Sequence, residues 1–135
     1  MSFVQNNFWL IMIAVTAAFM LVWPSISRRV SGVGEVQPAE AVQKINREDA
    51  LVLDVREDNE YRAGHIPNAR HIPLSQLASR LSELEKFKDR PIVVNCRSGA
   101  RSASACGTLS KAGFNVFNLR GGIIAWEQAS LPVEK

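Results

Sequence analysis

The first 27 residues of the chain carry no charged side chain. All 29 Lys, Arg, Asp and Glu residues lie at Arg28 or later, although the net charge of +3 and the 21% of charged residues are ordinary for a globular protein of 135 residues. Apolar residues fill 19 of the first 27 positions but only 44 of the remaining 108. The chain therefore consists of two unlike pieces, and the larger one is long enough for one modest domain.

Residues 8–23 form an apolar run whose only polar member is Thr16, and its hydroxyl can bond back to a helix carbonyl. As a helix the run spans roughly 24 Å, against about 30 Å for a hydrocarbon core, and uncharged neighbours extend it on both sides. We therefore expect residues 1–27 to be a single transmembrane helix that contacts the lipid bilayer through residues 8–23. A cleaved signal peptide is disfavoured, because no basic residue precedes the run and no cleavage motif follows it.

Positive charge flanks the apolar run only on its C-terminal side, at Arg28 and Arg29. The positive-inside rule then places the N-terminus outside and residues 28–135 in the cytoplasm. Residues 28–36 mix Ser and Gly with few apolar residues and no period, so they predict a flexible linker. The folded domain is expected over residues 37–135.

Strand and helix patterns alternate along this domain. Compact apolar runs predict strands at 51–55, 91–96 and 116–119. Helical spacing or composition predicts helices at 38–46, 75–87 with Ser75 as the N-cap, 100–112 and 123–129. Because the 91–96 strand is almost fully apolar, it is expected in the centre of a sheet covered on both faces. The alternation indicates an α/β domain with a mostly parallel central sheet.

Cys96 lies where the 91–96 strand ends and a helix follows, which is where α/β sheets gather their chemistry. The intervening loop is Arg97, Ser98, Gly99, Ala100 and Arg101. Helix N-terminal amides and two arginines favour the thiolate over the thiol, and Gly99 lets the backbone curl tightly around the sulfur. The pattern predicts a nucleophilic cysteine, whereas the alternative is a cysteine that merely ends a core strand.

The other candidates for chemistry are weaker. Cys106 lies in the middle of a predicted helix among small apolar residues and is expected to be a core residue. Its spacing from Cys96 is not that of a redox C-x-x-C pair, and two Cys and two His without ligand spacing predict no metal site and no cofactor. The largest basic cluster is the Arg28–Arg29 pair, so no nucleic-acid partner is expected.

Three runs of the domain resemble the recurring blocks of a single rhodanese domain, a sulfurtransferase. They are LDVREDNEYRAGHIPNARHIP, PIVVNCRSGARSASACGTLSKAGF and LRGGIIAWEQASLPV, in the right order over roughly residues 37–134. The resemblance implies a three-layer α/β fold. With its N-terminal apolar segment, the chain is similar to small bacterial rhodanese-like proteins of the inner membrane, which implies that location and makes a membrane protein an additional candidate partner.

The resemblance also implies a ping-pong reaction. The Cys96 thiolate takes a sulfane sulfur from a donor such as thiosulfate, holds it as a persulfide and passes it to cyanide or a thiol acceptor. Residues 97–101 would bind the donor, with amides facing the persulfide and the guanidinium of Arg97 facing the donor oxygens. The family leaves open whether Arg101 binds substrate or braces the loop.

Four further residues are expected to order the loops beside the cysteine. Asp54 and Arg56 leave the 51–55 strand at the same sheet edge as Cys96, and the resemblance assigns them this supporting role, together with Glu60. His65 is expected to fix the loop after Gly64, with general-base catalysis as its alternative.

Two alternatives to a sulfurtransferase stay open. A related fold carries C-x5-R loops that cradle phosphate, which makes a phosphatase the rival enzyme; the C-x4-R loop from Cys96 to Arg101 is one residue shorter, which suits a single sulfur atom better. The other alternative is a membrane-anchored binding or regulatory module that uses the fold without catalysis, because a fold alone does not give a function.

Overall fold

The protein is described by a computed structural model over residues 2–31 and 33–135. It divides into two compact units, Met1–Val30 and Ser31–Lys135. Residue 1 of the expected anchor and residue 32 of the expected linker lie outside the described residues. The side chains of residues 24–33 lie outside them too, including the basic flank at Arg28 and Arg29.

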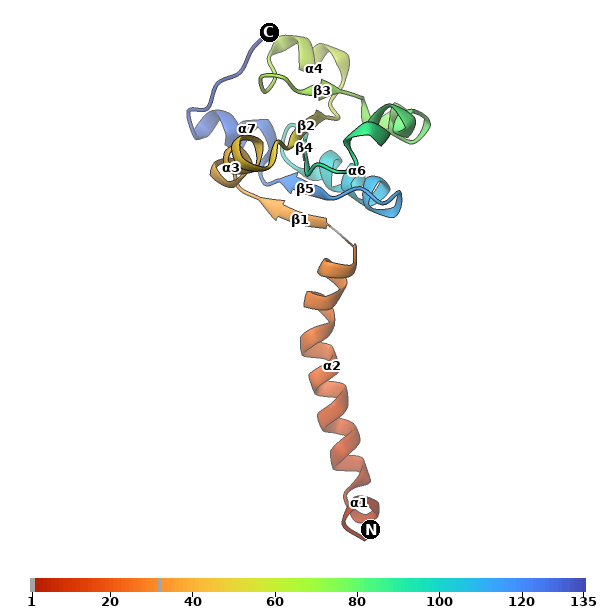
Figure 1. The fold of residues 1–135 in the computed structure, drawn as a ribbon. Coiled ribbons are helices and arrows are strands. Elements are labelled where there is room, and N and C mark those ends of the chain that lie inside the picture. Colours follow the sequence, from red (N-terminus) through yellow and green to blue (C-terminus); the bar gives the residue numbers. More distant parts are fainter. Residues whose placement is uncertain (1, 32) are drawn as a thin grey trace. The chain divides into compact units, whose positions relative to one another are not determined.

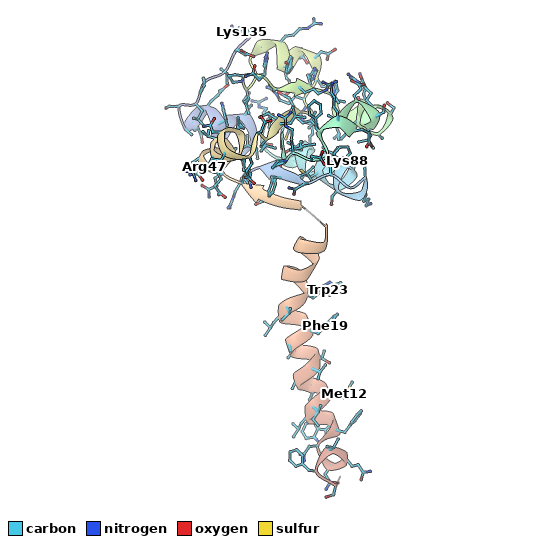
Figure 2. All side chains as sticks on the ribbon, in the orientation of Figure 1. Met12, Phe19, Trp23, Arg47, Lys88 and Lys135 are labelled. Carbon is cyan, nitrogen blue, oxygen red and sulfur yellow. The ribbon has the colours of Figure 1, made fainter. Side chains whose placement is uncertain are left out.

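The N-terminal unit is helical, with α1 at Ser2–Asn6 and α2 at Phe8–Ser31. Its large apolar side chains are exposed, among them Met12, Phe19 and Trp23, which project from α2 in Figure 2. As expected, the Thr16 hydroxyl donates to the carbonyl of Met12 at 2.8 Å. Among the helices that the structure describes, none has both the length and the apolar character needed to cross a membrane. The predicted transmembrane anchor is not confirmed.

The second unit is built on five parallel strands in the order β1-β5-β4-β2-β3. The strands are β1 Val33–Val36, β2 Leu51–Asp54, β3 Arg70–His71, β4 Ile92–Asn95 and β5 Val116–Leu119. The helices are α3 Pro38–Glu48, α4 Asp58–Ala63, α5 Leu74–Leu77, the 3-10 helix η1 Ala78–Phe87, α6 Ala100–Lys111 and α7 Gly122–Gln128. Strand and helix alternate around the sheet in Figure 1, so the predicted α/β class with a parallel sheet is confirmed.

Two apolar cores sandwich the sheet and make three layers. One core joins the sheet to α5, η1 and α6 through residues such as Leu77, Leu84 and Leu109. The other joins the opposite face to α3 and α7 through Ala41 and Trp126. Strand β4 is buried along its whole length at the centre of the sheet, as its apolar sequence predicts.

The prediction of a flexible linker at 28–36 is wrong for both ends of that range, which are helix and strand in the structure. Helix α2 continues to Ser31, because each residue added to a formed helix contributes one more hydrogen bond. Residues 33–36 are the edge strand β1, which pairs with β5 from Val33 opposite Val116 to Val36 opposite Leu119. Val36 is 3% exposed, so the strand is held by burial as well as by backbone pairing.

The helix predicted at 75–87 is also different in detail. It begins at Leu74 with Pro73, not Ser75, as the N-cap, and after Leu77 it continues as the 3-10 helix η1 with a kink at Arg80. The leucine spacing still places Leu77 and Leu84 in the core. Apolar spacing of three and four residues suits both helix types over so short a segment, so it did not distinguish them. The short elements α4 and β3 were not predicted.

Candidate active site

The centre of the sheet delivers a cysteine to a tight turn. Cys96 follows the last residue of β4, is 1% exposed, and is separated from the start of α6 by only three residues. Gly99, the N-cap of α6, has φ +108°, a conformation that L side chains rarely adopt. This conformation turns its N–H toward the sulfur, to which it donates at 3.0 Å. The turn therefore wraps backbone amides around Cys96 Sγ, as the sequence predicts.

The surroundings of Cys96 favour its thiolate. Burial raises the pKa of the Cys96 thiol, but hydrogen bonds from the Ser102 side chain and from the amides of Ser102, Gly99 and Ser98 outweigh burial and lower that pKa below its usual value. The buried Cys106 has no such donors, and burial raises its pKa to about 12. Cys106 is fully buried in the core, as predicted. Only Cys96 is thus set up as a nucleophile.

A buried polar network lies behind the sulfur. The Ser102 hydroxyl, in the first turn of α6, lies 3.4 Å from Cys96 Sγ and is also within hydrogen-bond distance of Asn118 Oδ1 of strand β5. The other end of the Asn118 side chain, Nδ2, donates to the Gly99 carbonyl at 3.1 Å. The network links the loop to a strand neighbouring β4 and fixes the position of Gly99.

The N-terminus of α7 closes the loop from another side. The amides of Ile123 and Ile124 donate to the carbonyls of Cys96 and Arg97 at 2.9 and 3.2 Å. This approach requires glycine at position 122, where a Cβ atom would lie 2.5 Å from the carbonyl oxygen of Arg97 and closer still to that of Cys96. The loop carbonyls are thus turned away from the sulfur, and the N–H groups are left to face it.

The remaining loop residues differ in their availability. Arg97, Ser98 and Ala100 are exposed, and the guanidinium of Arg97 makes no hydrogen bond or ion pair with any described residue. Arg101 instead binds Glu60 through two hydrogen bonds of 2.7 and 2.9 Å. Arg97 is therefore the guanidinium of the loop that is free to meet an anion, and Arg101 braces the loop against α4.

Asp54 and Arg56 form a buried ion pair at the end of β2. The Arg56 guanidinium donates to both carboxylate oxygens of Asp54 over 2.8 to 3.1 Å, and its Nη2 also donates to the Gly64 carbonyl at 2.7 Å. Both residues are at most 5% exposed. The pair ties β2 to the end of α4. Glu60 of the same helix binds Arg101, so the Asp54–Arg56 pair supports the cysteine loop indirectly, through α4.

His65 lies in an aromatic stack. Its ring is 3.9 Å from that of Tyr61, and His71 stacks against the same tyrosine at 4.4 Å. Nδ1 of His65 lies 3.0 Å from the Tyr61 carbonyl, and its backbone pairs with Glu134 near the C-terminus. These contacts correspond to the structural role expected for His65.

Sequence reasoning missed three residues of this site: Ser102, Asn118 and Gly122. Asn118 is the polar residue of the otherwise apolar run 116–119, and this position was a sign in the sequence that its side chain is buried for a function. Ser102 has the small polar side chain that the first turn of a helix tolerates, and nothing in the sequence separates it from its neighbour Ser104. Gly122 lies between the predicted strand 116–119 and the predicted helix 123–129, and nothing in the sequence marks it as a contact with the loop.

The fold and this cysteine loop define a class, the proteins with a rhodanese-like domain. The model of the rhodanese-like domain matches residues 37–129. The chain belongs to the rhodanese family.

Its relatives include proteins named as sulfurtransferases. A sulfurtransferase of Allochromatium vinosum is 43% identical over 103 residues, which are 75% of this chain and 94% of the relative. A thiosulfate sulfurtransferase of Pseudoalteromonas translucida is 35% identical over 92 residues, 67% of this chain and 86% of the relative. The crystal structure of a rhodanese-related protein from Thermoplasma volcanium matches with a TM-score of 0.69 and 36% identity, over 75% of this chain and 97% of that one. The similarity supports a rhodanese-type enzyme.

Proposed function

We propose that the protein moves a sulfane sulfur from a small anionic donor such as thiosulfate, through a Cys96 persulfide, to cyanide or a thiol acceptor. The observation that carries the proposal is the surroundings of Cys96 Sγ, where the Gly99 amide and the Ser102 hydroxyl lie within 3.4 Å. The name of the Pseudoalteromonas relative supports thiosulfate as a donor to test. The exposed guanidinium of Arg97 offers a partner for the donor's oxyanion.

The first half-reaction loads the cysteine. The Cys96 thiolate attacks the outer sulfur of thiosulfate, an Sγ–S bond forms, and the S–S bond of the donor breaks with its electron pair leaving on sulfite. The charge of the new persulfide lies on its terminal sulfur, which N–H groups at the start of α6 stabilise. No proton has to move in this step.

The second half-reaction removes the sulfur from the Cys96 persulfide. The acceptor's electron pair attacks the terminal sulfur, the bond to Sγ breaks, and Cys96 leaves as a thiolate. With cyanide the product is thiocyanate, and the enzyme returns to its starting charge. A thiol acceptor must first lose its proton to solvent and then gains the sulfur as its own persulfide.

The test is the mass of the intact protein after incubation with thiosulfate. We expect wild type to gain one sulfur atom that cyanide removes as thiocyanate, and Cys96→Ala to gain none. Cys106→Ala is the matched control and should load like wild type, because Cys106 is buried away from the donors that activate Cys96. Equal loading of wild type and Cys96→Ala would contradict the proposal. Aryl phosphate turnover above thiosulfate turnover would favour a phosphatase instead.

We further propose that the N-terminal unit attaches this enzyme to the inner membrane of a bacterium, with residues 28–135 in the cytoplasm. Support comes from the uncharged first 27 residues, the exposed apolar side chains of α2 and the placing of Arg28 and Arg29 after the apolar run. A membrane location would put the sulfur carrier beside membrane proteins as potential acceptors.

A further inference from the structure

The Ser102 hydroxyl has one proton and three acceptors around it. They are the Gly99 carbonyl at 3.1 Å, Asn118 Oδ1, and Cys96 Sγ at 3.4 Å. Ser102 is fully buried and Asn118 is 6% exposed, so among these groups the hydrogen bonds are not exchanged freely with bulk water. The protein groups around Ser102, and not bulk water, therefore determine which acceptor receives the hydrogen bond of the hydroxyl.

The Gly99 carbonyl is already satisfied. It accepts from the amide of Ala103 at 3.1 Å and from Nδ2 of Asn118 at 3.1 Å, which uses both lone pairs of the oxygen. The same bond fixes the orientation of the Asn118 amide, since the flipped amide would place two oxygens against each other. Asn118 Oδ1 therefore faces Ser102, and the proton of Ser102 is left with two acceptors, Asn118 Oδ1 and Cys96 Sγ.

The charge on Sγ changes during the proposed reaction. In the free enzyme Sγ is a thiolate and a strong acceptor, whereas in the persulfide the charge has moved to the terminal sulfur and Sγ is a weak acceptor. A hydrogen bond to an ionised acceptor is about twice as strong as one between neutral groups. Asn118 Oδ1, by contrast, has the same charge in both states, so the balance between the two acceptors shifts with the state of the sulfur.

We propose that the Ser102 hydroxyl donates to Asn118 Oδ1 while Cys96 carries the persulfide and turns to Cys96 Sγ as the thiolate leaves, which makes Ser102 a catalytic residue of the unloading half-reaction. The inference rests on the proposed sulfur transfer. Asn118 is the positioning residue, because it holds the hydroxyl beside Sγ and accepts the hydrogen bond of the hydroxyl in the persulfide state. No proton is transferred: the Sγ–S bond breaks, its electron pair stays on Sγ, and the hydrogen bond stabilises that charge.

The two half-reactions should therefore respond differently when the hydroxyl is removed. A thiol of lower pKa leaves faster but attacks more weakly. Without the hydroxyl, Cys96 is a poorer leaving group and a better nucleophile once it is ionised. Ser102→Ala is expected to slow unloading about tenfold, and loading is expected to stay unchanged or rise by up to about threefold.

The experiment separates the two steps with thiosulfate and cyanide as probes on the full chain. Sulfite release reports loading, and thiocyanate formation from the loaded protein reports unloading, both by rapid mixing at a pH where Cys96 is ionised in every variant. Ser104→Ala is the matched control, because Ser104 is an exposed serine of the same helix and should behave like wild type. Ser102→Thr and Ser102→Val form a second pair, whose new side chains are nearly equal in size but differ in the presence of a hydroxyl. Only the Ser102→Thr variant should unload quickly.

A second readout is independent of sulfur transfer. The rate of Cys96 alkylation by iodoacetamide, followed against pH, should show a higher thiol pKa in Ser102→Ala than in wild type. The role assigned to Ser102 is overturned if Ser102→Ala unloads at the wild-type rate, or if both half-reactions slow by the same factor. A wild-type protein that never gains sulfur would instead contradict the proposed function, and the alkylation profile would still show whether Ser102 bonds to the thiolate.

Discussion

Glu60 shows how a single residue holds the cysteine loop. Hydrogen bonds from the Arg101 guanidinium lower the pKa of its carboxyl from 4.5 to about 2, although burial acts in the opposite direction. A depressed pKa means that the pair stabilises the folded state above pH 4.5 and that this contribution is lost as the pH falls toward 2. We expect Glu60→Gln to lower the free energy of unfolding by about 1 kcal/mol at pH 7, measured by urea denaturation, and the difference from wild type to shrink below pH 4.5.

Glu127→Gln provides the control for this substitution, because Glu127 is exposed and takes part in no ion pair among the described residues. It should unfold like wild type at each pH. A difference between Glu60→Gln and wild type that is the same at pH 7 and at pH 2 would show that the charge of Glu60 is not what stabilises the loop.

At the scale of secondary-structure elements, the site depends on how closely the start of α7 approaches the loop after β4. Gly122 has φ +58°, and a Cβ atom there would overlap the carbonyls of Cys96 and Arg97. Gly122→Ala should therefore push α7 away from the loop, lower the free energy of unfolding by about 2 kcal/mol or more, and strongly reduce sulfur loading of Cys96. Urea denaturation and intact-mass analysis measure the two effects.

Gly107→Ala is the matched control for that element. Gly107 lies inside α6, and nothing comes within 4 Å of the position that its Cβ would take. Alanine suits a helix better than glycine, so this variant should be as stable as wild type or up to about 1 kcal/mol more stable, with normal loading. If Gly122→Ala matched Gly107→Ala in both measurements, close packing of α7 on the loop would not be needed for the site.

At the scale of the whole molecule, the two units should have separate functions: membrane attachment for the N-terminal unit and sulfur transfer for the second unit. A chain of residues 31–135 keeps every strand of the sheet and all residues of the site. We expect it to load sulfur from thiosulfate at the wild-type rate and to be recovered in the soluble fraction of bacterial cells, whereas the full chain sediments with the membranes. A reporter fused after Lys135 of the full chain should be active only in its cytoplasmic form. Full-length protein in the soluble fraction, or periplasmic reporter activity, would contradict the proposed location.

The point of truncation matters for this comparison. A chain that begins at Gln37 retains the whole of the region matched by the family, but it lacks β1 and the burial of Val36. Its free energy of unfolding should fall by about 2 kcal/mol or more relative to residues 31–135, and β5 becomes an exposed sheet edge. Equal urea midpoints for the two chains would show that β1 adds nothing to the fold.

The sequence by itself determined the α/β class, the central position of β4 and the nucleophilic setting of Cys96. These features depend on local patterns: an apolar run, a glycine at a strand-to-helix turn, and amides at the start of a helix. Residues 33–36 were not recognised as a strand, because four residues that follow Gly32 and include Gly34 carry no local strand signal. They become a strand only when β5 offers its free edge.

Only the tertiary structure decided how the loop is held. Asn118 is 22 positions from Cys96 in sequence, and the pairing of β4 with β5 brings it to Ser102 and Gly99. Arg101 was a candidate for substrate until the fold placed Glu60 against it. Side-chain contacts between distant residues depend on strand order and register, which short-range patterns do not specify, whereas the chemistry of Cys96 follows from the residues next to it in the chain.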